Sequence, residues 1–184
     1  IVYEWNLPTG WTCPYAKECL VKVDKVTGKM DNKSNAYKCY SASAERFPGV
    51  RKSRWNNLEQ SKDSLPPLPK KCKSVRIHAS GDFYSQAYFD KWIDYCNENK
   101  DVEFWAYTKS LNYWVRRLND IPENLVLTAS WGGKHDNLIT EHNLKSAMVI
   151  SEMKYDKPID YNDDVARQKD VSFYLLDNNK KIKR

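Results

Sequence analysis

No stretch of this chain is apolar over the ~20 residues that a membrane-spanning helix needs, and only 41% of its 184 residues are hydrophobic. It also has no charged-then-apolar leader, so we expect neither a membrane span nor a secretion signal. Two motifs are missing as well: a Cys-x2-Cys pair and a phosphate-binding Gly-rich loop ending in Lys-Ser/Thr. No cysteine follows Cys96 in the sequence. These absences argue against membrane proteins, secreted disulfide scaffolds and P-loop nucleotide-binding proteins.

Aromatic residues make up 13% of the sequence, which argues against disorder. The length suits one domain with a substantial core, so we expect a single domain over residues 1–184. Within it we expect a cysteine-rich metal-binding segment at 1–64 and an α/β core at 74–176, joined by an extended, proline-rich linker at 65–69. The net charge of +6 permits a polyanionic partner without requiring one.

The second part of the chain alternates strand-like and helix-like patterns. Such alternation predicts βαβ units with parallel pairing and right-handed crossovers. We therefore predict an α/β fold: an open, mostly parallel sheet or partial barrel of about four to five βα units. The expected strands are 75–80, 102–108, 125–130, 147–152 and 171–176, and the expected helices are 85–97, 111–118 and 141–145.

The first part is rich in turns and precedes this core as a cysteine-rich loop and a helical segment. Alternating residues after Cys19 and a polar loop at 31–35 predict a short hairpin or an exposed excursion. A helical pattern starts at Lys38, is interrupted near Pro48-Gly49, and continues through residues 50–59. The basic end of the chain, 180–184, is expected to fray.

Five cysteines are an awkward number for disulfides, and their distribution suggests a metal site instead. Cys13, Cys19 and Cys39 lie in polar, loop-like contexts, where an inert thiol gains little from burial. Thiolates can hold zinc or an iron–sulfur cluster, and the spacing by itself leaves the metal open. Cys96 lies on the apolar side of an expected helix, and we interpret it as a core residue.

Cys72 is the candidate fourth ligand, because Lys71 and Lys73 would favour its thiolate. It precedes a strand of six expected residues, which spans roughly 20 Å. Cys72 could therefore join the other three only if the metal lay at the amino edge of the sheet. Otherwise the fourth position is open or is held by a group other than cysteine.

Polar residues cluster at or just beyond the expected carboxyl ends of three strands, the edge where parallel α/β folds bind ligands. They form a candidate ligand pocket: His78, Asp82, Thr108, Lys109, Ser130 and Trp131. His78 with Asp82 could make a proton-relaying pair and Lys109 could hold an anion. The structural alternatives are that Asp82 caps the next helix and that His78 is a hydrogen-bonded core residue. No catalytic residue is identified.

Two basic stretches also contain tryptophan, namely 46–55 and 114–117. Basic side chains interleaved with aromatic ones can face nucleic acid. Solvated helix faces explain both stretches more simply.

Several motifs resemble the phage gene-product-88-like family. They are Trp5-Asn6-Leu7-Pro8, Thr12-Cys13-Pro14, Cys39-Tyr40, the block from Val75 to Phe83 containing Ser-Gly-Asp-Phe, and the block from Phe104 to Ser110 containing Ala-Tyr-Thr-Lys-Ser. Small marine-phage members of this family are described as iron–sulfur proteins. The resemblance therefore implies a [4Fe-4S] cluster rather than zinc, a viral origin and a location in the cytoplasm of the infected host. It implies no particular reaction.

Two departures from the family pattern bear on the metal site. Many relatives place the third cysteine a few residues after the second, whereas Cys39 follows Cys19 by 20 positions, which suggests a loop insertion. A cysteine-rich C-terminal segment of longer relatives is not present, so we expect one metal site.

The leading functional hypothesis is a viral iron–sulfur protein for electron transfer or redox sensing, with an unidentified redox partner. The alternatives are a radical-type cluster enzyme, which lacks the usual Cys-x3-Cys-x2-Cys loop here, a nucleic-acid-binding regulator with a structural cluster or zinc, and a zinc-stabilised binding module.

Overall fold

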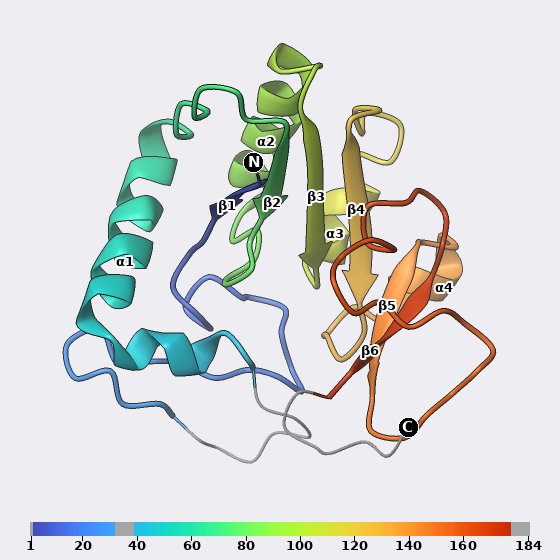
Figure 1. Cartoon of the computed structure of the whole chain (residues 1–184), viewed down its shortest axis with the longest axis horizontal. Coiled ribbons are helices and arrows are strands. Elements are labelled where there is room, and N and C mark those ends of the chain that lie inside the picture. The colour runs from blue at the N-terminus through green and yellow to red at the C-terminus, as the bar shows by residue number, and fades with distance from the viewer. Residues whose placement is uncertain (1, 32–38, 178–184) are drawn as a thin grey trace.

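Six parallel strands form the centre of the computed structural model, which describes residues 2–31 and 39–177 (Figure 1). Their spatial order follows the chain: β1 (Val2–Trp5), β2 (Ser74–Ile77), β3 (Glu103–Thr108), β4 (Leu125–Ser130), β5 (Ser146–Ile150) and β6 (Phe173–Leu176). Because every neighbouring pair is parallel, all carboxyl ends lie at one edge. The predicted α/β class with an open parallel sheet is confirmed.

One face of the sheet packs against α2 (Gln86–Glu98), which lies behind the strands in Figure 1. The Ser85 side chain caps this helix by accepting a hydrogen bond from the Tyr88 N–H at 3.2 Å. Helical spacing then turns Phe89, Trp92 and Cys96 toward the sheet. Cys96 is fully buried there, which confirms its interpretation as a core residue.

The opposite face is covered by the chain between β5 and β6. Ala166 from this connection packs with Trp105, Val126 and Phe173 of the sheet. The Lys145 ammonium fixes the connection by donating to the carbonyls of residues 165, 166 and 168 at 3.1, 2.7 and 2.6 Å. Burial lowers the pKa of Lys145 to about 8.

Several expectations for individual elements were wrong. The strand β1 was not expected, and the helix expected at 141–145 is instead α4 (Asn137–Glu141), with Lys145 at the start of β5. The interruption expected near Pro48-Gly49 falls at Phe47, and Pro48 begins α1 (Pro48–Asp63), where its missing N–H has no helical partner to lose. A short 3₁₀ helix, η1 (Ala42–Arg46), precedes it, and α3 (Leu111–Val115) is shorter than expected.

The hairpin expected after Cys19 is reduced to a single antiparallel bridge between Val23 and Met30. Most of the polar loop expected at 31–35 and the basic end at 180–184 lie outside the described residues. Within the described part of the chain, no helix combines the length and apolar character needed to cross a membrane.

Candidate functional site

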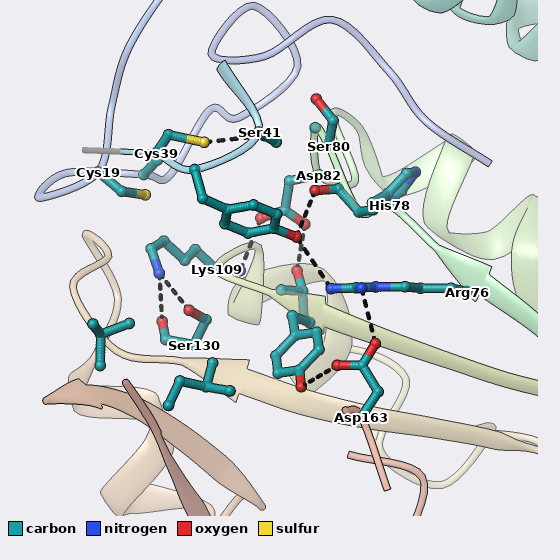
Figure 2. Close-up of a pocket in the computed structure, with 18 of the residues that line it drawn as sticks. Cys19, Cys39, Ser41, Arg76, His78, Ser80, Asp82, Lys109, Ser130 and Asp163 are labelled. Carbon is teal, nitrogen blue, oxygen red and sulfur yellow. Dashed lines mark hydrogen bonds and ion pairs between the residues drawn. The ribbon is translucent and has the colours of Figure 1, made fainter. Parts of the chain in front are cut away.

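The cysteine-bearing loops lie at the carboxyl edge of the sheet because they follow β1 directly. After Trp5 the chain crosses the strand ends, and the Leu7 N–H donates to the Ser80 carbonyl at 2.9 Å. Cys13, Cys19 and Cys39 then line one cavity of about 430 Å³ together with the ends of β2, β3 and β4. Figure 2 shows Cys19 and Cys39 at this cavity. This volume lies in the range of small-molecule sites.

The turn after β2 holds the half of the loop that carries Cys13. The Ser80 hydroxyl donates to the Leu7 carbonyl at 2.9 Å, and the Ser80 N–H donates to Asn6 at 2.9 Å. Gly81 has a φ of +87°, and a Cβ there would lie 2.6 Å from the side chains of Leu7 and Thr12. Only glycine therefore lets the loop pack this closely.

The turn after β4 holds the half that carries Cys19. The Gly132 carbonyl accepts the N–H groups of Lys17 and Glu18 at 3.2 and 3.0 Å. Ala16 also forms an antiparallel bridge with Gly133. Two strand-end turns thus fix the loop on either side of the cavity.

A buried ion pair holds the segment that carries Cys39. The Glu45 carboxylate accepts Arg54 at 2.8 Å and the Thr9 N–H at 2.7 Å. The Arg54 guanidinium also donates to the Ser41 carbonyl at 3.0 Å, and Cys39 Sγ lies 3.1 Å from the Ser41 hydroxyl. Glu45 and Arg54 therefore tie the Cys39 segment to the loop that leads to Cys13.

The three thiols are close enough to influence one another electrostatically. Burial, followed by the nearby Asp82 carboxylate and then by Cys39 and Cys19, raises the pKa of Cys13 well above its usual value. Within residues 2–31 and 39–177, however, no three His, Cys, Asp or Glu side chains are grouped tightly enough to hold a single metal ion.

Cys72 lies at the other end of the sheet and does not line this cavity. It precedes Ser74, the first residue of β2, whereas Arg76 is the first residue of that strand to line the cavity. Four positions separate Cys72 from Arg76, which is about 13 Å at the rise of an extended chain. Its thiol is buried in the main core and donates to the Ser74 carbonyl at 3.4 Å.

Asp82 and Lys109 organise the strand ends rather than presenting free charges. Asp82 accepts hydrogen bonds from the Thr108 hydroxyl at 2.6 Å and from the N–H groups of Phe83 and Lys109 at 2.7 and 2.8 Å. Burial outweighs these bonds and raises the pKa of Asp82 to about 6. Asp82 does not cap α2, because Ser85 does.

The Lys109 ammonium projects toward β4. It donates to the Ser130 hydroxyl and carbonyl at 2.5 and 3.2 Å and to the Trp131 carbonyl at 2.8 Å (Figure 2). Of the six expected pocket residues, all but Trp131 line the cavity, and Trp131 contributes through this carbonyl.

The His78 ring points away from the cavity into the core and makes no contact with Asp82 (Figure 2). Its Nε2 lies 2.8 Å from the Tyr88 hydroxyl, which accepts the Trp5 indole N–H at 3.0 Å. Burial lowers the pKa of His78 to about 3, so the ring is neutral. Nε2 and the Tyr88 hydroxyl therefore share a hydrogen bond whose direction depends on the ring's tautomer, and the expected proton-relaying pair with Asp82 is not formed.

The far side of the cavity has a charged network that the sequence did not reveal. Arg76 pairs with Asp163 at 2.8 Å and donates to the Tyr40 hydroxyl at 3.1 Å, while Tyr107 donates to Asp163 at 2.9 Å (Figure 2). The buried Arg76 Nε has no partner among the described residues. A lone arginine in an apolar strand was the available signal for Arg76, but nothing marked Asp163 in its loop.

Three arginines of the two basic stretches are used within the fold, whereas Arg46, Lys52 and Arg116 are exposed. Arg51 and Arg54 are buried and bind backbone and carboxylate oxygens, and Arg117 pairs with Asp90 at 2.7 Å. Their charges are used within the fold.

Comparison with known proteins places the chain in a family. The family model described as gene product 88 matches residues 2–181. The chain is also similar to the Gene 88 protein of Mycobacterium phage L5, with 49% identity over 37 residues, which are 20% of this chain and 16% of that relative. The match thus spans less than a fifth of the curated relative, and no solved structure matches. The chain belongs to the gene product 88 family of phage proteins.

Proposed function

We propose that this phage protein binds a [4Fe-4S] cluster through Cys13, Cys19 and Cys39. The observation that carries the proposal is the convergence of these thiols, up to 26 positions apart in sequence, on one cavity. Their expected location is the cytoplasm of the infected host, where thiols stay reduced and available for metal.

The donor set suits an iron–sulfur cluster better than a single zinc ion. Zinc holds its sulfur ligands at about 2.3 Å, which brings them within about 4 Å of one another, and the described residues contain no group that tight. In a cluster each thiolate takes a different iron, so the sulfurs stand further apart. Because Cys72 does not line the cavity, the cluster would have three cysteine ligands, and its fourth iron would have no cysteine ligand.

A bound cluster would supply one-electron chemistry. The protein's own contribution is to fix the thiols on rigid turns and to keep them partly buried. The Lys109 ammonium and the hydrogen bonds of Asp82 hold the adjacent strand ends in place. The one-electron chemistry of such a cluster supports a redox role for the protein.

The cavity favours a second candidate, a radical-type cluster enzyme, over a simple electron carrier. An electron-transfer protein needs no substrate cavity beside its cluster, whereas this cavity extends from the thiols past three strand ends to Arg76 and Asp163. The sequential parallel strands also have the strand order of a partial barrel, the fold expected for such an enzyme. The missing Cys-x3-Cys-x2-Cys loop argues against it, so the choice needs an experiment.

The first experiment is anaerobic reconstitution followed by iron and sulfide analysis and a visible spectrum. We expect about four iron atoms per chain and broad absorbance near ~400 nm. Cys13→Ala, Cys19→Ala or Cys39→Ala should abolish the cluster, while the matched Cys96→Ala and Cys72→Ala should retain it. A colourless protein with stoichiometric zinc would refute the proposal.

The enzyme candidate is tested on the reduced, loaded protein. S-adenosylmethionine should change the EPR signal of the cluster if an iron is open to it. An unchanged signal at saturating concentration would leave the electron-transfer role as the proposed function.

A further inference from the structure

An exposed surface beside the cysteine loop combines aromatic and cationic side chains. We call it the tryptophan–lysine patch, and its residues are Trp11, Lys22, Lys25, Val26, Arg46, Phe47 and Trp55. Val26 is 82% exposed, Phe47 54% and Trp11 50%. Exposed tryptophan of this extent is typical of interaction sites, because its large apolar surface gains most from being covered.

The patch is one continuous surface because a buried arginine joins its parts. Arg51 donates to the carbonyls of Lys25 and Val26 at 3.2 and 3.1 Å and to those of Glu45 and Arg46 at 2.6 and 2.9 Å. This places the tip of the excursion after Cys19 against the start of α1. Trp11 and Trp55 also lie beside each other, with ring centroids 6.1 Å apart.

A cation lies over each aromatic ring of the patch. Lys22 stands over Trp11 at 4.7 Å, Lys25 over Trp55 at 4.6 Å, and the Arg46 guanidinium over Phe47 at 4.8 Å. The one carboxylate in residues 22–28, Asp24, is held by the Thr27 N–H and hydroxyl at 2.6 and 2.8 Å. Asp24 stays ionised, and the exposed Glu59 lies near Lys25, so the surface offered to a partner is apolar and net positive through Lys22, Lys25 and Arg46.

The patch adjoins the thiols through a short stretch of chain. Trp11 is two positions before Cys13, in a turn closed by the Cys13 N–H and the Gly10 carbonyl at 3.2 Å. Lys22 is three positions after Cys19. A protein docked here would stand next to the loop that bears two of the three thiols.

We propose that the tryptophan–lysine patch docks an acidic one-electron carrier protein that reduces the cluster. This inference rests on the proposed function. One electron would pass from the reduced carrier to the cluster, which is reduced as the carrier is oxidised, and no covalent bond would form or break. Positive charge at the rim steers an acidic partner, and the tryptophans provide the apolar anchor.

A protein partner is favoured over single-stranded nucleic acid. Stacking of bases needs free aromatic faces, whereas ammonium groups stand over Trp11 and Trp55. Two further members, Val26 and Phe47, are exposed and apolar, and their side chains offer no donor to a phosphate.

The test uses a plant-type [2Fe–2S] ferredoxin as the acidic carrier. Calorimetric titration into the cluster-free and the loaded protein should give binding that weakens at least tenfold between low and high salt. Trp11→Ala, or Lys22→Glu with Lys25→Glu, should weaken it at least tenfold. The matched control is Lys100→Glu, which reverses an exposed charge near the amino edge of the sheet and should leave binding unchanged.

Stopped-flow reduction separates docking from cluster binding. Iron content is measured first, so a protein that loads no iron refutes the proposed function before any carrier is added. In loaded protein, the patch variants should slow reduction by ferredoxin but not by dithionite. Equal rates with ferredoxin in wild type and patch variants would overturn the docking proposal. Retention of a labelled oligothymidylate that is lost in the same variants, without ferredoxin binding, would also overturn it.

Discussion

Replacing Gly81 by alanine should detach the cysteine loop from the turn after β2. The residue has a φ of +87°, and its new Cβ would lie 2.6 Å from Leu7 Cβ and Thr12 Oγ1. Neither neighbour can yield freely. Leu7 is fully buried, and the Thr12 hydroxyl is bonded to the Pro8 carbonyl at 2.8 Å.

The cost has two parts. Left-handed backbone costs an alanine about 1–2 kcal/mol. Forced repacking in a dense interior adds about 1–3 kcal/mol. The free energy of unfolding should therefore fall by about 2–5 kcal/mol, which moves a urea midpoint by about 1–2.5 M at an m-value of about 2 kcal/mol/M.

Gly49→Ala is the matched control. Gly49 lies in the first turn of α1 with no atom within 4 Å of a new Cβ. The same substitution there should stabilise by up to about 1 kcal/mol, because alanine loses less entropy in a helix. Urea unfolding of both variants measures the difference. Equal free energies of unfolding would refute the argument that close approach requires Gly81.

Three further predictions concern the supports of the site, each measured by urea unfolding of cluster-free protein. Arg54→Ala should lower the free energy of unfolding by about 3–5 kcal/mol, because it leaves the buried Glu45 carboxylate unpaired. The control Lys52→Ala, on the exposed side of α1, should change the free energy of unfolding by less than about 0.5 kcal/mol. Gly132→Ala, with a φ of +91° and only the Glu18 side chain in the way, should cost about 1–2 kcal/mol. Burial raises the pKa of Asp82 from 3.8 to about 6, so its contribution to stability is present below pH 4 and is lost as the pH rises through 6. Relative to Asp82→Asn, the wild type should lose about 2 kcal/mol between pH 4 and 7.

Each of these has an outcome that contradicts it. Equal effects of Arg54→Ala and Lys52→Ala would show that the buried pair contributes little. If Gly132→Ala and Gly81→Ala lowered the free energy of unfolding equally, the left-handed backbone rather than contact with neighbouring side chains would determine the cost of both substitutions. A difference between wild type and Asp82→Asn that does not vary with pH would mean that Asp82 titrates normally.

The predictable part of the fold is the part with strong local patterns. The strand expected at 125–130 matches β4, and alternation of strands and helices indicated the parallel sheet. The strand β1 escaped prediction because it has four residues and its partner β2 begins at Ser74, far along the chain. The position of α4 was predicted wrongly, because the sequence suggests Lys145 as a cation at the end of a helix. Lys145 instead donates to three carbonyls of another loop.

The site was predictable only as far as strand ends could be located. Parallel topology places Lys109 and Ser130 at one edge, so their closeness to each other follows from the sequence, whereas the sequence leaves open the edge at which the thiols lie. The orientation of His78 does not, because its φ of +64° turns the ring toward Tyr88 and away from the cavity. Asp163 comes from an irregular connection, whose path depends on packing across the sheet rather than on local pattern.

All three thiols belong to the single connection between β1 and β2. The later connections supply walls and charges but no sulfur. Lengthening or shortening that one excursion therefore alters the sulfur geometry without disturbing any strand pairing. Conversely, the opposite wall, including Arg76 and the segment bearing Asp163, can diverge between relatives while the sulfur ligands stay fixed. The connection that would hold a metal is thus separate from the wall that would determine substrate specificity, so the two parts can evolve independently.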